Sequence, residues 1–175
     1  MATRDSRLLS WLVFLLGAGV LAAVVWARIA GTGTGWRGDL VGLPVGELPV
    51  TEMGGGDAEV THPATIYFFE TSCIPCGPAT RELNRFSARR REGALPLFAI
   101  TNSLAFSRDS ALAFSRAVRT LRLRRSTPEL RIVRELPLIV RTDARGRIVR
   151  AYVGIPGADA LDVLGYPWQA SATGR

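Results

Sequence analysis

Two cysteines, Cys73 and Cys76, are the only thiols in this chain of 175 residues, and two residues separate them. They directly follow residues 64–69, an apolar run rich in aromatic side chains that is typical of a buried strand. Two thiols at this spacing can close a disulfide across one helical turn and open it again. The pair therefore predicts thiol–disulfide redox chemistry.

A helix is expected at 74–91, immediately after the first cysteine. Its apolar face recurs at helical spacing and consists of Cys76, Ala79, Leu83 and Phe86. Cys73 would lie at the helix N-terminus, where unpaired backbone N–H groups and the positive end of the helix dipole stabilise a thiolate. We therefore interpret Cys73 as the nucleophile and Cys76, one turn further along on the inward face, as the resolving thiol.

The N-terminal residues 8–27 contain no charged side chain and could cross a hydrocarbon core of about 30 Å as a helix. Arg4 and Arg7 precede this run, so the positive-inside rule predicts that residues 1–7 lie in the cytoplasm. A cleaved signal peptide ending at Ala27 is the alternative, although its apolar region would exceed the usual length of about 7–15 residues. Either interpretation predicts that the cysteines lie outside the cytoplasm.

A hairpin with a proline at its start is expected further along the chain. Pro137 precedes the apolar run 138–140, and residues 143–146 form a predicted turn before a second strand at 148–153. Periodicity predicts three further elements, which are a strand at 95–101 and helices at 107–121 and 157–164. The basic connection 122–134 is expected to be an edge strand or a loop.

In this order, the strand, the Cys-x-Pro-Cys segment, the helices and the proline-led hairpin resemble the thioredoxin superfamily over roughly residues 64–165. With the apolar N-terminus, the chain is most similar to membrane-anchored bacterial members used in cytochrome c maturation and related envelope thiol chemistry, including the type encoded with amine dehydrogenases. The resemblance implies an α/β thioredoxin-like fold, with a central mixed sheet flanked by helices and preceded by one transmembrane helix. It also implies that Pro137 is cis, faces the cysteine pair and positions the backbone of a partner.

The implied function is that of a thiol:disulfide oxidoreductase that exchanges disulfides with client proteins and needs no cofactor or metal. A transmembrane electron donor or acceptor is the second expected partner, and the expected location is the periplasmic side of the bacterial cytoplasmic membrane. The predicted parts are a cytoplasmic terminus 1–7, an anchor 8–27, a flexible tether 28–59 with a shortened hairpin, the domain 60–168 and a disordered tail 169–175.

Three residues depart from the family pattern. Ser72 stands where the family usually has tryptophan, and Ala79 where members acting on apocytochrome often have glutamate. Tyr67 occupies the place of an acidic residue that is buried in many thioredoxins, which leaves Glu70 as the nearest candidate proton acceptor. The departures at Ser72 and Ala79 favour a client other than apocytochrome c.

Several alternatives stay open at this stage. The two cysteines could form a structural disulfide, although so short a loop gains little chain entropy. Together with His62 they could instead bind copper, because two thiols and an imidazole suit a soft metal. The domain could also bind a client without turnover.

The net charge of +7 comes entirely from arginine, since all 22 basic residues are Arg. We expect the arginine clusters 89–91 and 122–125 to be solvated faces. No nucleic-acid partner is expected for an anchored extracytoplasmic domain.

Overall fold

The computed structural model describes residues 17, 19–20, 34–46, 48–103, 114–124 and 133–167. The chain divides into two compact units, Met1–Thr34 and Gly35–Arg175. The predicted membrane span 8–27 belongs to the first unit and lies outside the described residues, apart from residues 17, 19 and 20, whose backbone is helical. Within the described parts of the chain, none of the helices is both long and apolar enough to span a membrane. The predicted tail 169–175 also lies outside the described residues.

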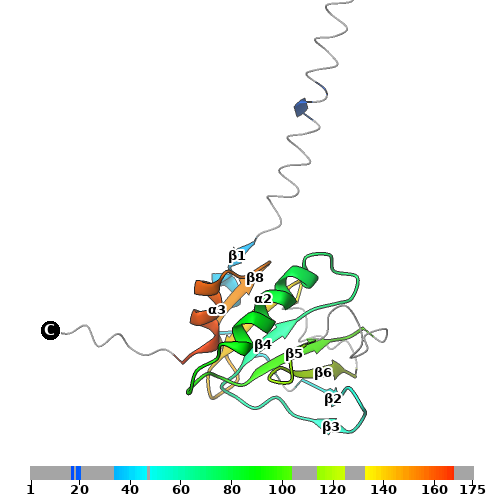
Figure 1. Cartoon of the computed structure of the whole chain (residues 1–175), viewed down its shortest axis with the longest axis vertical. Helices are drawn as coiled ribbons and strands as arrows, with labels where there is room; N and C mark the ends of the chain where they lie inside the picture. The colour runs from blue at the N-terminus through cyan, green and yellow to red at the C-terminus, as the bar shows by residue number, and fades with distance from the viewer. Residues whose placement is uncertain are drawn as a thin grey trace, which may run out of the picture. The chain divides into compact units, whose positions relative to one another are not determined.

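An eight-stranded sheet with the order β1-β8-β7-β4-β5-β6-β2-β3 forms the centre of the second unit (Figure 1). The strands are β1 (Gly35–Trp36), β2 (Val50–Glu52), β3 (Asp57–Ala58), β4 (Thr65–Phe68), β5 (Leu97–Thr101), β6 (Arg119–Leu123), β7 (Leu138–Thr142) and β8 (Ile148–Val153). Strands β4, β5 and β6 run parallel, whereas β7 is antiparallel to β4, so the sheet is mixed, as the family resemblance implies.

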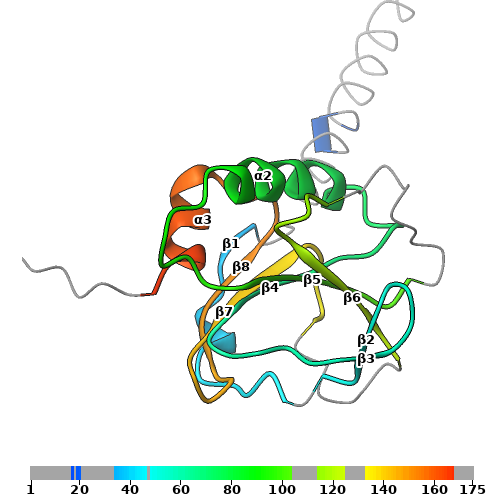
Figure 2. The ribbon, with the colours of Figure 1, turned by 60° about the horizontal axis from the view of Figure 1, so that its bottom comes forward.

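Two helices, α2 (Cys76–Ala88) and α3 (Ala158–Gly165), cover one face of the sheet (Figure 2). The core on this face includes Tyr67, Leu83 and Leu161. A second core on the opposite face is covered by the segment that contains the 3-10 helix η1 (Gly38–Leu40), β2 and β3. Strand β4 is buried along its whole length between these layers, because its apolar side chains alternate between the two cores.

The segment 28–59 is not a flexible tether throughout, which corrects the sequence prediction. Residues 28–33 lie outside the described residues, but β1, η1, β2 and β3 all fall between 35 and 59. Val45 and Val50 from this segment are buried in the core. Its glycines and prolines therefore mark turns between short elements, and β2 and β3 form an antiparallel hairpin within this segment.

The helix predicted at 107–121 is wrong at its C-terminal end, where Arg119–Leu123 form β6. Residues 104–113 lie outside the described residues. Leu121 and Leu123 are buried while the residues on either side are partly exposed, so a period of two decides the local structure over the apolar spacing of a helix. The basic residue Arg122 belongs to the same strand and is half-buried.

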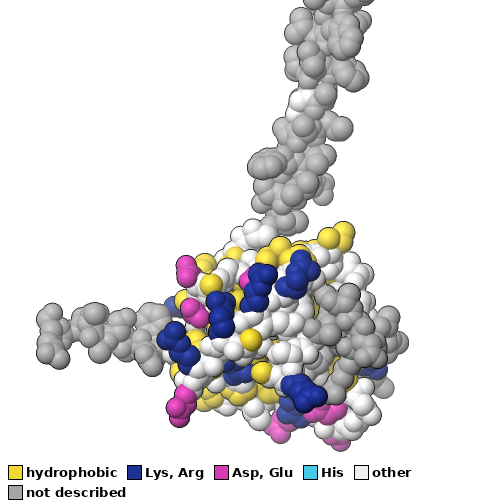
Figure 3. Space-filling model, viewed as in Figure 1, with side chains coloured by type: hydrophobic (Ala, Val, Ile, Leu, Met, Phe, Trp, Pro, Cys, Tyr) yellow, Lys and Arg dark blue, Asp and Glu magenta, His cyan; other side chains and the backbone are white. Residues whose placement is uncertain are grey.

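The arginine cluster 89–91 is only partly a solvated face. Figure 3 shows a row of basic side chains over α2. The α2 residues Arg81 and Arg85, and Arg89 and Arg91 of the cluster, are exposed. Arg90 is half-buried instead, and its guanidinium donates hydrogen bonds to the carbonyl oxygens of Ala94 and Leu95. Arg90 therefore ties the end of α2 to the connection leading into β5.

Candidate redox site

A disulfide joins Cys73 to Cys76 at the junction between β4 and α2, with an S–S distance of 2.04 Å and a Cα–Cα distance of 5.3 Å. Cys76 is the first residue of α2 and is fully buried, whereas Cys73 lies in the preceding loop and is partly exposed. The Cys76 N–H donates to the Cys73 carbonyl at 3.1 Å, which folds the loop into a turn. The helix begins two residues later than predicted, with Pro75 as its N-cap.

The two sulfurs therefore differ in access. Ile74, between them, is 91% exposed, so the loop presents Cys73 at the surface of the domain. Cys76 lies on the inner face of α2, in the core between the two helices and the sheet, and cannot meet an external partner directly. A thiolate on Cys73 would lie beyond the N-terminus of α2, where the helix dipole favours negative charge.

A buried tyrosine lies behind Cys76. The Tyr67 hydroxyl donates to the Cys76 carbonyl at 3.0 Å and lies 3.3 Å from Thr80 Oγ1. The ring stacks on Phe69 with centroids 5.4 Å apart, and it meets Phe114 edge-on at 5.9 Å. Burial raises the pKa of Tyr67, so the group behind the resolving cysteine is a neutral hydroxyl.

Glu70, the acidic residue considered in the sequence analysis, contributes chiefly through its backbone. Its carbonyl accepts the Cys73 N–H at 3.2 Å, and its carboxylate accepts a long hydrogen bond of 3.5 Å from the Ser72 hydroxyl. The loop is also held by a contact that sequence reasoning missed, between the hydroxyls of Thr71 and Ser103 at 2.8 Å. Ser103 follows β5, and the parallel pairing of β4 with β5 brings the ends of both strands to one edge.

Pro137 lies at the same edge of the sheet as the disulfide. Leu138, the first residue of β7, pairs with Phe68, the last residue of β4, so the residues on either side of this pair share one edge. The resemblance implied a cis bond here, and the Leu136–Pro137 peptide bond is cis. Pro137 is buried, and its carbonyl accepts the Gly154 N–H at 2.9 Å.

Exposed apolar side chains occur at the same edge. Trp36 lies in β1 opposite Tyr152 of β8 and is half exposed. Ile155 is also about half exposed and directly follows Gly154, whose N–H donates to the Pro137 carbonyl. The Trp36 ring packs edge-on against Tyr152, with centroids 5.4 Å apart. Ile74, between the two cysteines, is a third exposed apolar side chain at this edge.

The single histidine is not brought to the cysteines. His62 precedes the start of β4, at the opposite end of that strand from the disulfide, and its Nδ1 lies 2.7 Å from Thr142 Oγ1. Among the residues that the structure describes, no group of three or more His, Cys, Asp or Glu could hold a metal ion. The copper set of two cysteines and His62 is therefore not assembled.

Comparison with known proteins identifies a fold. No protein-family model and no curated protein matches the sequence. Among solved structures, the thioredoxin domain of a thiol-disulfide oxidoreductase from Bacteroides vulgatus gives a TM-score of 0.58 at 12% identity, covering 70% of this chain and 94% of that one. A putative thiol:disulfide interchange protein DsbE from Chlorobium tepidum gives 0.53 at 19% identity, covering 70% and 92%.

A thio-disulfide isomerase from Thermus thermophilus gives a TM-score of 0.50 at 22% identity, covering 73% of this chain and 99% of that one. Likeness at these identities concerns the fold. The described domain therefore has the thioredoxin-like fold of these thiol–disulfide proteins, with a cysteine pair at its strand-to-helix junction.

Proposed function

We propose that this protein is a thiol:disulfide oxidoreductase that exchanges disulfides with client proteins through Cys73 and Cys76. The observation that carries the proposal is the unequal access of the two sulfurs, one partly exposed and one fully buried, at the edge that also holds the cis Leu136–Pro137 bond. A disulfide serving only stability needs neither this asymmetry nor this position.

In the oxidising direction, a client thiolate attacks Cys73 Sγ and breaks the bond to Cys76, which leaves as a thiolate. The second client thiolate then attacks the client sulfur of this mixed disulfide, forms the client disulfide and releases Cys73 as a thiolate. The client loses two electrons and the protein gains them. The reducing direction is the reverse sequence, in which Cys73 attacks and Cys76 resolves.

Other groups at the edge bind and orient the client. The exposed Ile74 offers apolar contact beside Cys73, and Trp36 and Ile155 offer it further along the same edge. The segment leading into Pro137 presents backbone to an extended client. Tyr67 fixes the backbone of Cys76 by its hydrogen bond and stays protonated, so it does not remove a proton from the Cys76 thiol. That proton is transferred to solvent or to the client.

The anchoring and the location are part of the proposal and are supported by the uncharged run 8–27. The domain would lie on the periplasmic side of a bacterial membrane and exchange electrons with a transmembrane partner. Ser72 and Ala79 support a client other than apocytochrome c. Protease added to spheroplasts should degrade the domain, whereas protection from the protease would contradict the proposed side of the membrane.

Client trapping tests the activity. The Cys76→Ser variant should accumulate mixed disulfides through Cys73, because the resolving thiol is missing, and Cys73→Ser should accumulate none. The reduction potential of the wild-type pair should fall between about −120 and −270 mV, the range of catalytic thiol–disulfide proteins. A pair that stays oxidised below about −300 mV and traps no client would be a structural disulfide.

A further inference from the structure

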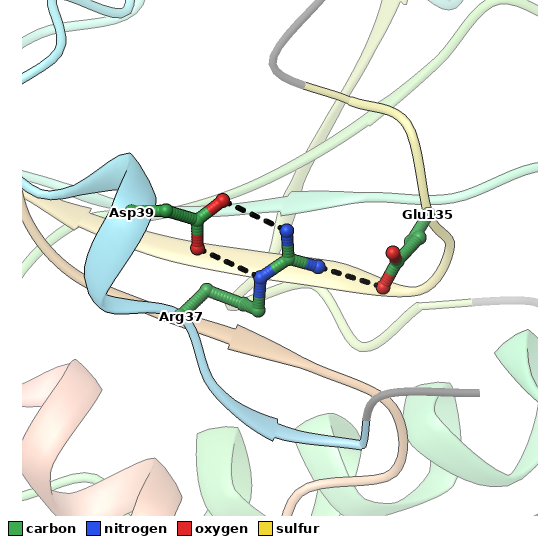
Figure 4. A network of polar contacts seen from close by, with 3 residues as sticks. All are labelled: Arg37, Asp39 and Glu135. Atoms are coloured by element: carbon green, nitrogen blue, oxygen red, sulfur yellow. Dashed lines mark hydrogen bonds and ion pairs between the residues drawn. The ribbon is translucent and has the colours of Figure 1, made fainter. Parts of the chain in front are cut away.

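An arginine from the beginning of the domain contacts the segment that leads into Pro137 (Figure 4). Arg37 follows β1 and donates from Nη1 to Glu135 Oε2 at 2.8 Å, across a sequence separation of 98 residues. Its Nε and Nη2 donate to the two carboxylate oxygens of Asp39, each at 2.8 Å. The guanidinium therefore bridges two carboxylates, and one of them belongs to the residue two positions before Pro137.

Arg37 is itself held in place by backbone and carboxylate contacts. Its N–H donates to the Ala151 carbonyl at 2.9 Å, which fixes its backbone to β8. The paired hydrogen bonds to Asp39 fix the plane of the guanidinium, because a carboxylate and a guanidinium match in a two-pronged geometry. The remaining Nη1 donor is thus directed at Glu135 by a prearranged group.

The contact between Arg37 and Glu135 acts on the segment that leads into Pro137. Arg37 and Glu135 line a cavity of about 290 Å³ together with Leu138, the residue that directly follows Pro137. Leu136, between Glu135 and Pro137, packs against both cores of the domain. Holding Glu135 on the face away from α2 therefore fixes the approach of the chain to the cis bond.

We propose that Arg37 is a positioning residue of the disulfide-exchange site, which fixes the segment before Pro137 through Glu135 so that it can bind an extended client. This inference rests on the proposed function. It concerns client binding and leaves the chemistry of the two sulfurs unchanged.

Two probes of the full-length oxidised chain separate these effects. The first is an unstructured peptide with two cysteines, whose backbone the segment before Pro137 can bind. The second is dithiothreitol, a dithiol without a peptide group. The reactions are single turnovers, because the Cys73–Cys76 disulfide is the oxidant and is consumed; KM here is the half-saturating peptide concentration and kcat the limiting rate. Arg37→Gln should raise KM for the peptide about fivefold, the size expected for one exposed charge pair, and change kcat by less than about twofold. The rate with dithiothreitol should change by less than about twofold.

Arg119→Gln is the matched control. Arg119 pairs with Glu52 between β6 and β2, away from Pro137, and the two side chains are 47% and 35% exposed, compared with 27% and 45% for Arg37 and Glu135. This control should leave both reactions as in the wild type. Glu135→Gln, which retains the Arg37–Asp39 pair, should reproduce the effect on KM even if Arg37→Gln fails to fold.

The double variant should be no worse than the single ones, because Arg37 and Glu135 act through one contact. Equal KM values for the wild type and Glu135→Gln would overturn the inference, as would an equal slowing of the peptide and dithiothreitol reactions by Arg37→Gln. A wild-type chain that reacts with dithiothreitol but never oxidises the peptide would refute the proposed function itself.

Discussion

Replacing Tyr67 by phenylalanine tests the hydroxyl behind Cys76 while it preserves the ring. The stacking on Phe69 and the edge contact with Phe114 are retained, and the hydrogen bond to the Cys76 carbonyl is lost. Thr80 lies four residues after Cys76, so its hydroxyl can turn to the same carbonyl and satisfy part of the loss. We therefore expect a destabilisation of about 1 kcal/mol, the net value of one neutral buried hydrogen bond.

The effect should depend on pH in a defined direction. In the unfolded chain Tyr67 has a pKa of about 10, whereas burial raises its pKa in the folded protein. The folded state therefore retains a proton that the unfolded state loses, and stability present below about pH 10 falls as the pH rises further. For this group the slope approaches about 1.4 kcal/mol per pH unit, and the Phe variant should lack that contribution.

Urea denaturation followed by near-ultraviolet circular dichroism, at pH 8 and at pH 11, measures both effects. Tyr152→Phe is the matched control, because the Tyr152 hydroxyl is exposed and makes a long hydrogen bond of 3.4 Å to the Ile155 carbonyl. It should cost less than about 0.5 kcal/mol. Equal losses for the two variants at pH 8, or equal pH slopes for the wild type and Tyr67→Phe, would refute a buried, neutral Tyr67 behind Cys76.

Three further changes test the packing of the domain at the end of the sheet opposite the disulfide. Gly165→Ala should destabilise the fold by about 1–3 kcal/mol, because the added Cβ would overlap the Phe86 ring, and a calorimetric scan would detect it. Arg141→Met should cost about 2–4 kcal/mol in urea denaturation, because this buried guanidinium donates to two carbonyls at the end of α3. Burial lowers the pKa of His62, so stability that is present above about pH 6.5 should be lost as the pH falls, and His62→Gln should reduce this acid sensitivity.

The local half of the site could be predicted from the sequence because its determinants lie close together in the chain. The spacing of Cys73 and Cys76, with helical apolar positions after them, specifies a strand, a turn and a helix in about 20 residues. The hairpin turn was predictable for the same reason: Asp143 Oδ1 accepts two backbone N–H groups, and Gly146 adopts a φ of 71°, which favours glycine.

The segment 28–59 shows where composition misleads. Glycine and proline are frequent both in flexible linkers and in the turns between short strands, so their number does not distinguish the two. The discriminating feature is the set of buried side chains, such as Val45 and Val50, whose partners on β6 and β8 lie far away in sequence. A short strand is stabilised by its neighbours in the sheet, and these are not visible from its own residues.

The distant half of the site depends on register. Pro137 reaches the disulfide edge because β7 pairs antiparallel to β4 with Leu138 opposite Phe68. The same pairing continues through β8 to β1, which brings Arg37 within hydrogen-bond distance of Glu135. An arginine in a chain with 22 of them carries no local signal of this role. Its proposed contribution to client binding follows only from the fold, which joins the residue after the first strand of the domain to the segment before Pro137.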